Sequence, residues 1–273
     1  MKAFIAHLQF EFRNAVRDRS LLLLNYLFPL VVYLIIGAMM VKLNPAFQAT
    51  LIPSMMMFAI LSSLILSLPT PLVTAREAGI FRSYRINGVP TRNILAVPAI
   101  TGIIHMMVVG GIILVTAGPL FQAPMPVHYG WFILGFILIC FACAGFGTLI
   151  GVISKDSRMT ILWSQLIFLP STMIGGIMIP TGALPDSLRN ISCLLPTSWA
   201  RQIFDLSLGT GSTSGIIWPV AILFSGGILC FLMASYLFSW DSQIRDKRKN
   251  PLWALVVLVP YVAGAMLNQI NSM

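Results

Sequence analysis

The chain has 273 residues, of which 58% are hydrophobic and only 9% are charged, and its formal net charge is +9. With a mean hydropathy of +0.89, nearly every residue is needed for membrane spans and short connections, which excludes a soluble domain of ordinary size. The pattern G-x-x-x-x-G-K-[ST] does not occur, so we expect no nucleotide-binding domain within these residues.

Residues 1–21 have the helical spacing of an amphipathic segment. The residues that carry the pattern are Phe4, Leu8, Glu11, Phe12 and Arg17. The phenylalanines and the leucine fall on one side, Glu11 falls on another, and arginines gather at the end nearest the first apolar stretch. This is typical of a helix lying at the membrane interface, and a simple basic flank of the first span is the alternative.

Six stretches without Asp, Glu, Lys or Arg follow, and the shortest has 20 residues, about what a helix needs to cross the hydrocarbon core. They are Leu22–Val41, Thr50–Val73, Ile94–Leu120, Tyr129–Ile153, Met159–Ile179 and Ile216–Phe238. Because they are apolar all round, they predict an all-α, polytopic integral membrane bundle with six transmembrane helices over residues 22–240.

The basic residues are distributed unevenly between the connections. The N-terminal segment and every second connection carry 14 of the 17 Lys and Arg residues, and the other connections carry three. By the positive-inside rule, the N-terminus and the even-numbered loops lie in the cytoplasm. The positive charge therefore reports orientation, and nucleic acid is not an expected partner.

The connection between the second and third stretches, residues 74–90, has signals for both ends of a helix. Thr74 and Glu77 have the spacing of a capping box, and Asn87-Gly88 before Pro90 is a helix stop. We expect a short cytoplasmic helix on which an exposed aromatic pair, Phe81 and Tyr84, lies beside Arg82 and Arg85 and forms a docking surface. The alternative is that the arginines only anchor the topology.

The connection between the fifth and sixth stretches is the longest. Its prolines predict two short helices that dip into the outer leaflet or cap a pathway, and ordinary loop packing is the alternative. The residues that mark this loop are Gly175, Gly176, Pro180, Leu184, Pro185, Pro196 and Trp199.

Residues 241–273 comprise a charged stretch and an apolar segment, Leu252–Leu267, which is interrupted by Pro260. At 16 residues this segment is marginal for crossing. It is either a short seventh span or a segment lying along the cytoplasmic interface.

Few residues within the predicted spans could bind a metal or an ion or take part in catalysis. The four cysteines suggest small packing residues rather than a metal or redox site, and no catalytic set of polar residues is present. His105 is the one titratable candidate for ion coupling within the spans, with a hydrogen-bonded packing role as the alternative. Met55, Met56, Met57 and Phe58 suit either an adaptable lining for lipophilic cargo or a lipid-facing surface.

These landmarks together resemble the type-2 ABC transporter permease family over residues 1 to about 240. The resemblance rests on Glu11-Phe-x-x-x-x-Arg17, on Phe28-Pro29, on the Glu77-x-Gly79 … Gly88-x-Pro90 helix, and on the Gly176 … Pro180 … Leu184-Pro185 … Pro196-x-x-Trp199 loop. It implies that residues 74–90 form the coupling helix seated in a cleft of an ATPase subunit. The residues of that contact are then Glu77, Gly79, Phe81, Arg82, Tyr84, Arg85, Gly88 and Pro90.

The resemblance further implies that the N-terminal helix packs near the coupling helix and that the loop before the sixth span forms part of an outer gate. We therefore expect the permease subunit of an exporter of hydrophobic or amphipathic compounds in a bacterial cytoplasmic membrane. The expected partners are soluble ABC ATPase subunits, which carry ATP and magnesium, a second permease copy or homologue, and the lipid bilayer. The alternatives are a non-transport scaffold or sensor subunit, and a proton-coupled transporter that depends on His105.

Overall fold

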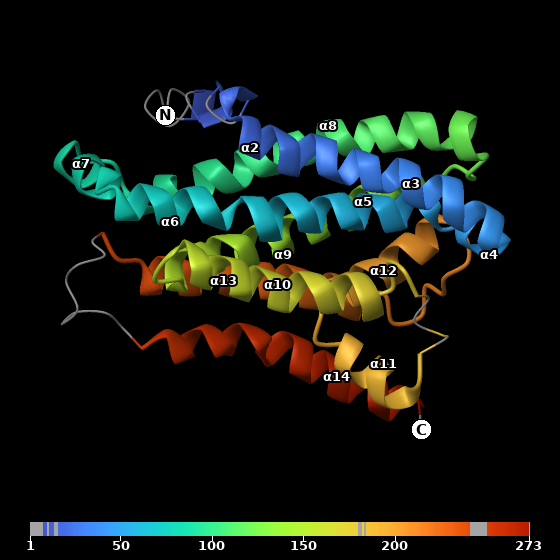
Figure 1. Cartoon of the computed structure of the whole chain (residues 1–273). Helices are drawn as coiled ribbons and strands as arrows, with labels where there is room; N and C mark the ends of the chain where they lie inside the picture. Colours follow the sequence, from blue (N-terminus) through green and yellow to red (C-terminus); the bar gives the residue numbers. More distant parts are fainter. Residues whose placement is uncertain are drawn as a thin grey trace.

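The computed structural model describes residues 8–9, 11–13, 16–179, 182, 184–240 and 250–272, and all elements assigned within them are helical. The helices form an elongated bundle of roughly parallel rods, with α7 (Ile80–Ile86) at one end and α11 (Asp186–Ser192) at the other (Figure 1). We call these the α7 end and the α11 end. The architecture confirms the all-α membrane bundle that the sequence predicts.

The first half of the chain contains α2 (Arg19–Leu22), the π-helical turn η1 (Leu23–Leu27), α3 (Phe28–Leu43), α4 (Pro45–Gln48), α5 (Leu51–Leu61), the π-helical turn η2 (Ser62–Ser67), α6 (Pro69–Glu77), α7 and α8 (Thr91–Phe121). The second half contains α9 (Tyr129–Ile153), α10 (Ser157–Ile174), α11, α12 (Pro196–Ser207), α13 (Ile217–Leu237), the 3₁₀ helix η5 (Pro251–Leu258) and α14 (Val259–Ser272).

Five helices of the described part are long and apolar enough to cross a membrane. They are Arg19–Leu43, Leu51–Glu77, Thr91–Phe121, Tyr129–Ile153 and Ile217–Leu237. The fifth predicted span, by contrast, is shorter than predicted. It corresponds to α10, which has 18 residues and ends before Gly175. At about 1.5 Å per residue it extends roughly 27 Å, slightly less than the hydrocarbon thickness.

The second predicted span lies at the centre of the bundle. Every residue of α5 is buried. In the most apolar 18-residue segment of this span 94% is buried, whereas in the corresponding segment of the first span 22% is. Met55, Met56, Met57 and Phe58 are no more than 5% exposed. A lipid-facing role for these four residues is therefore wrong, because they belong to the packed core.

Small residues permit the closest helix crossing of this core. A side chain at Gly147 of α9 would overlap the backbone carbonyl of Leu64 in η2. Such contacts are typical of membrane helices, where close backbone approach replaces the hydrophobic driving force available in water.

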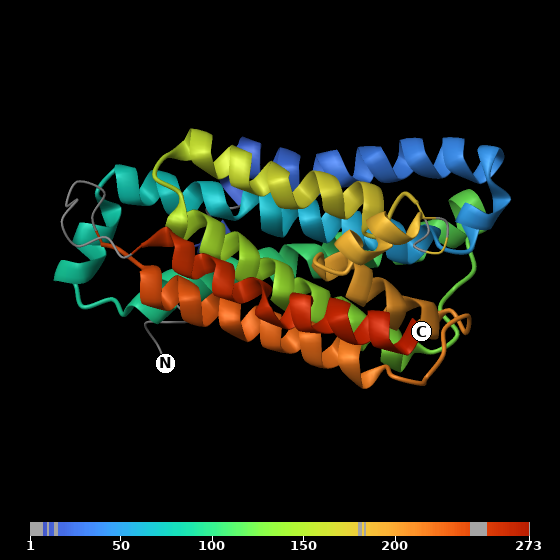
Figure 2. The same ribbon diagram turned by 90° about the horizontal axis from the view of Figure 1, so that it is seen from below.

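The apolar segment near the C-terminus runs along the bundle. Residues Pro251–Leu267 begin at the α7 end and continue beside α13 toward the α11 end (Figures 1 and 2). Tyr261 lies in a notch at Gly226 of α13 and packs on Phe146, with ring centroids 5.7 Å apart. This lengthwise packing favours a seventh span over a segment lying along the interface.

Candidate functional site

The junction between α6 and α7 differs from the capping box that the sequence suggests. Thr74 lies inside α6, where its hydroxyl donates to the carbonyls of Thr70 and Pro71 at 3.1 and 3.2 Å. The helix continues through Thr74 because nothing interrupts it before Ala78-Gly79. Gly79 has φ of 73°, a left-handed conformation that glycine adopts at little cost, and it directly precedes α7. The predicted cap is therefore wrong, and Gly79 separates the two helices.

The predicted helix stop at the other end of α7 is confirmed. Gly88 has φ of 70°, its N–H donates to the carbonyl of Arg85 at 3.1 Å, and the N–H of Val89 donates to the carbonyl of Tyr84 at 2.9 Å. The side-chain amide of Asn87 donates to the carbonyl of Ser83 at 2.8 Å. These bonds satisfy the last carbonyls of α7, and Pro90 then leads directly into α8.

Phe81 is not exposed, contrary to the expectation of an aromatic docking pair. Its side chain is 4% exposed and packs on Phe238, beyond the end of α13, with ring centroids 5.5 Å apart. The ring of Tyr84 lies 6.4 Å from that of Phe81 and is itself half-buried. The aromatic pair therefore attaches α7 to its own bundle, because Phe238 covers the side of α7 that carries it.

Another side of α7 is exposed and carries a different set of residues. Arg82, Arg85 and Ile86 are exposed, and the exposed fraction of Ile86 is 86%. The three positions share one helical face because they are separated by three and four residues. We call them the docking face. Ile86 was not among the predicted contact residues, although its spacing from Arg82 is visible in the sequence.

The N-terminal segment approaches the same helix. The pKa of Tyr84 is raised above its ordinary value. The larger cause is burial of the side chain, and the second is the nearby Glu11 carboxylate. Glu11, Phe81, Tyr84 and Pro98 share a cavity of about 40 Å³ with residues of α6 and α8. Phe12 stacks on the ring of His105, with centroids 4.9 Å apart. Of the residues predicted for the N-terminal interfacial helix, Leu8, Glu11, Phe12 and Arg17 are described by the structure, and Phe4 lies outside the described residues.

A buried arginine, Arg76, connects the last turn of α6 to the end of α9. The guanidinium of Arg76 donates to the carbonyl of Val152 at 2.8 Å and to that of Ser154, where α9 ends. A cation at a helix C-terminus is favourable because it meets unpaired carbonyls and the negative end of the helix dipole. Arg76 is one of the basic residues from which the orientation was predicted, and the sequence did not predict its contact with the end of α9.

At the α11 end, the chain folds into the two short helices that the prolines predict. Pro185 precedes α11 and Pro196 begins α12. Leu184 is buried, and Gly175 packs so closely on Ser171 and Thr197 that no side chain would fit there. Pro180 of the predicted gate lies outside the described residues.

A second buried arginine holds the bend that follows α10. Arg201 of α12 donates to the carbonyl of Gly176 at 2.9 Å and to the hydroxyl of Ser54 at 3.3 Å, and it pairs with Asp205 at 2.7 Å. Gly176 is buried and has φ of 84°. We call these four residues the outer clasp. It joins α5, the bend and α12, and Arg201 was not among the predicted gate residues.

Trp199 connects the two short helices to each other and to the C-terminal segment. Its indole N–H donates to the carbonyl of Cys193 at 2.7 Å. Its ring lies so close to Gly264 of α14 that a Cβ added there would meet the ring. The predicted gate residues Gly175, Gly176 and Trp199 are therefore all parts of a packed structure at this end.

Within the described residues, His, Cys, Asp and Glu do not gather in a group of three suited to a metal ion. The cysteines at positions 140, 143, 193 and 230 are buried free thiols. His105 is buried, and its Nδ1 lies 2.6 Å from the hydroxyl of Tyr26.

Comparison with known proteins agrees with this geometry. Residues 2–209 match the family described as ABC-2 type transporter, in its membrane domain. The chain belongs to the ABC-2 type transporter family. The match includes the docking face and the outer clasp and ends before α13, η5 and α14.

Two curated relatives of this ABC-2 permease domain are the inner membrane transport permeases YhhJ of Escherichia coli (strain K12) and of Shigella flexneri. Each is 26% identical over 125 residues, which cover 46% of this chain and 31% of the relative. The alignment therefore spans about a third of the length of these relatives. No solved structure matches this chain significantly.

Proposed function

We propose that this ABC-2 permease domain exports a hydrophobic or amphipathic compound across a bacterial cytoplasmic membrane, driven by soluble ATPase subunits that bind the docking face. ATP and magnesium would be held by those subunits. A second permease, identical or homologous, would complete the pathway. The finer features of this proposal, namely the class of compound, the direction and the partners, go beyond membership of the family.

The observation that carries the proposal is the construction of α7. A left-handed glycine bounds this helix at each end, Phe81 anchors it to the bundle, and its exposed face presents the apolar side chain of Ile86 beside two arginines. An apolar anchor with a charged rim is the usual division of a protein interface. Because Arg76 joins α6 to the end of α9, a push on α7 would reach two membrane helices at once.

The proposal requires the α7 end to be cytoplasmic, as the positive-inside asymmetry indicates. In a cysteine-free background, we expect Ser83→Cys to react with a membrane-impermeant maleimide only after the cells are opened. Ser187→Cys, in α11, should react in intact cells. Both side chains are exposed, so access depends on the side of the membrane. Labelling of Ser83→Cys from outside intact cells would reverse the orientation and remove the basis for a cytoplasmic partner.

Transport itself can be measured in inside-out membrane vesicles that contain the chain together with the ATPase encoded nearest to its gene. We expect ATP to drive accumulation of a lipophilic dye such as Hoechst 33342, and a non-hydrolysable ATP analogue to drive none. A protonophore should leave the accumulation intact. Accumulation that persists without ATP and collapses with the protonophore would instead support proton coupling, and no accumulation would favour a scaffold.

A further inference from the structure

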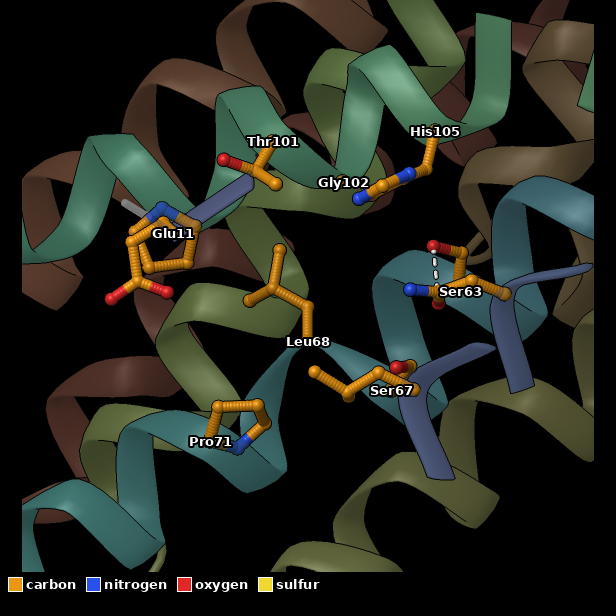
Figure 3. A pocket seen from close by; sticks show the side chains of 11 residues that line it. Glu11, Ser63, Ser67, Leu68, Pro71, Thr101, Gly102 and His105 are labelled. Carbon is orange, nitrogen blue, oxygen red and sulfur yellow. Dashed lines mark hydrogen bonds between the residues drawn. The ribbon is translucent and has the colours of Figure 1, made fainter. Parts of the chain in front are cut away.

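A small cavity with several polar side chains in its lining lies between the first three membrane helices, near the α7 end. It has a volume of about 60 Å³. Its lining comprises Glu11, Leu21, Asn25, Ser63, Ser67, Leu68, Pro71, Pro98, Thr101, Gly102 and His105. Figure 3 shows Thr101 and His105 of α8 across the cavity from Ser63 and Ser67. Six of these eleven residues have polar side chains, which is unusual within spans that are otherwise almost wholly apolar.

Two π-helical turns border this cavity. Asn25 belongs to η1 of the first span, and Ser63 and Ser67 belong to η2 of the second. The Ser63 hydroxyl donates to the Asn25 side-chain oxygen at 2.9 Å (Figure 3). Single π-helical turns inside α-helices widen the helix locally and frequently mark functional sites. Here both of them bring polar side chains to the same cavity.

Two buried polar atoms at the cavity have no hydrogen-bond partner among the described residues. They are the hydroxyl of Thr101 and Nε2 of His105, whose residues are only 4% and 1% exposed. An unsatisfied buried polar group costs roughly 1–3 kcal/mol, so such atoms normally have a partner. The volume is sufficient for a small polar group or a few water molecules, since one water needs about 10–15 Å³.

The lining favours a positively charged ligand that donates hydrogen bonds. It includes the carboxylate of Glu11, and none of the described residues lining it is Lys or Arg. Pro71 in α6 adds acceptor capacity, because a proline has no N–H to offer the carbonyl four residues earlier. The carbonyl of Ser67, which also lines the cavity, is therefore without that donor.

We propose that this cavity binds the primary ammonium group of an amphiphile. Its three N–H donors would meet the Thr101 hydroxyl, the Ser67 hydroxyl and Nε2 of His105, with the Glu11 carboxylate supplying the opposite charge. His105 then has its proton on Nδ1 and donates it to Tyr26. The cavity offers hydrogen-bond acceptors to the N–H donors of a primary ammonium, whereas a trimethylammonium has no N–H to donate to them. The apolar tail would extend past Leu21 and Leu68 into the lipid.

The depth of the cavity suits such a ligand. Asn25 lies six residues after Arg19, where the first membrane helix begins, which corresponds to roughly 9 Å along the helix axis. An amphiphile held there would keep its head near the membrane interface and its tail in the hydrocarbon. The ammonium could come from a free amine or from the head group of an ethanolamine lipid. This site is independent of the proposed export, because it requires only the permease chain.

The test is binding to the purified chain in phosphatidylcholine nanodiscs at pH 7, measured by isothermal titration calorimetry. The probes are octylamine, octan-1-ol and octyltrimethylammonium, which share one tail length. We expect saturable binding of octylamine alone. The double variant Thr101→Val with Ser67→Ala should bind octylamine at least tenfold more weakly, because two acceptors of a charged donor are lost. Glu11→Gln should also weaken binding.

Thr116→Val is the matched control, because Thr116 lies on the same helix, away from the cavity, with its hydroxyl bonded to Tyr33 and the Ile112 carbonyl. It should leave octylamine affinity unchanged. The thermal unfolding midpoint of each variant shows whether it is folded. Equal binding of the three probes would overturn the proposal, as would native affinity in the folded double variant. If ethanolamine lipid in the discs lowers octylamine affinity, the lipid head is the natural occupant; otherwise a free amine is.

Discussion

Replacing Ile86 with Asp is expected to release the ATPase subunit while the permease still inserts and folds. Ile86 is the most exposed apolar residue of α7, so its removal leaves the bundle packing untouched. An apolar anchor at the centre of an interface is worth about 2 kcal/mol or more, which predicts at least a 30-fold weaker complex. The measurement is co-purification of the ATPase with a tagged permease, together with the dissociation constant in nanodiscs.

Phe81→Ala provides the contrast, because Phe81 is buried against Phe238. Truncation of a buried phenylalanine costs about 3–5 kcal/mol, so this variant should lower the thermal unfolding midpoint. Ile86→Asp should leave the midpoint unchanged. Val127→Asp is the matched control for a charge at an exposed apolar position, since Val127 is 64% exposed and lies in the connection before α9.

Reversing the charge of Arg85 should act differently from removing the apolar side chain of Ile86. We expect Arg85→Glu to slow association with the ATPase and to change its salt dependence, because exposed rim charges mainly steer encounter. If Ile86→Asp retains the ATPase at native affinity and transports normally, α7 is not the docking element. The arginines would then serve only as topology anchors.

Replacing Arg201 with Met is expected to open the α11 end and to depress ATP-driven transport. Arg201 holds Gly176, Ser54 and Asp205 together from a buried position. Methionine keeps much of the volume but removes every one of these bonds. Breaking a buried ionic contact by removing one partner typically costs about 3–5 kcal/mol. We place the cost here at the lower end, because the Asp205 side chain is 30% exposed and retains contact with water.

Opening can be measured with a cysteine reporter in a cysteine-free background. Ser198 on α12 is 4% exposed, so Ser198→Cys should react slowly with an impermeant maleimide applied from outside the cells. Adding Arg201→Met should increase the labelling rate several-fold. Arg92→Met, which removes an exposed arginine at the start of α8, is the control for loss of charge alone. Unchanged labelling and unchanged transport in the Arg201 variant would show that the outer clasp does not control this end.

Much of the fold was predictable because its causes are local. A helix with no polar face and about 20 residues cannot be buried in an ordinary soluble domain, so the long apolar stretches alone predict the membrane bundle. The stop at Asn87-Gly88 was equally predictable, because a left-handed glycine terminates a helix whatever surrounds it. Proline positions likewise predicted α11 and α12.

The predictions that the structure contradicts depend on interactions between distant parts of the chain. Thr74 has the spacing of a cap, but the helix of the second span continues through it, since packing around α6 outweighs a local signal. Phe81 was expected to be exposed because no residue near it in sequence covers its ring. In the structure its ring is covered by Phe238, which lies far along the chain. α10 is shorter than its apolar stretch because the backbone bends at Gly175 and Gly176, and the bend is held by Arg201.

Sequence by itself therefore determined that this protein is a helical membrane protein, where most of its helices run and where α7 ends. These properties depend on hydrophobicity and backbone preference, which each segment carries on its own. Only the tertiary structure decided which face of α7 is exposed and which polar residues gather around His105. It also decided that Arg76 and Arg201 are buried. Those properties depend on which helices become neighbours, and apolar helices of similar composition contain little local information about their partners.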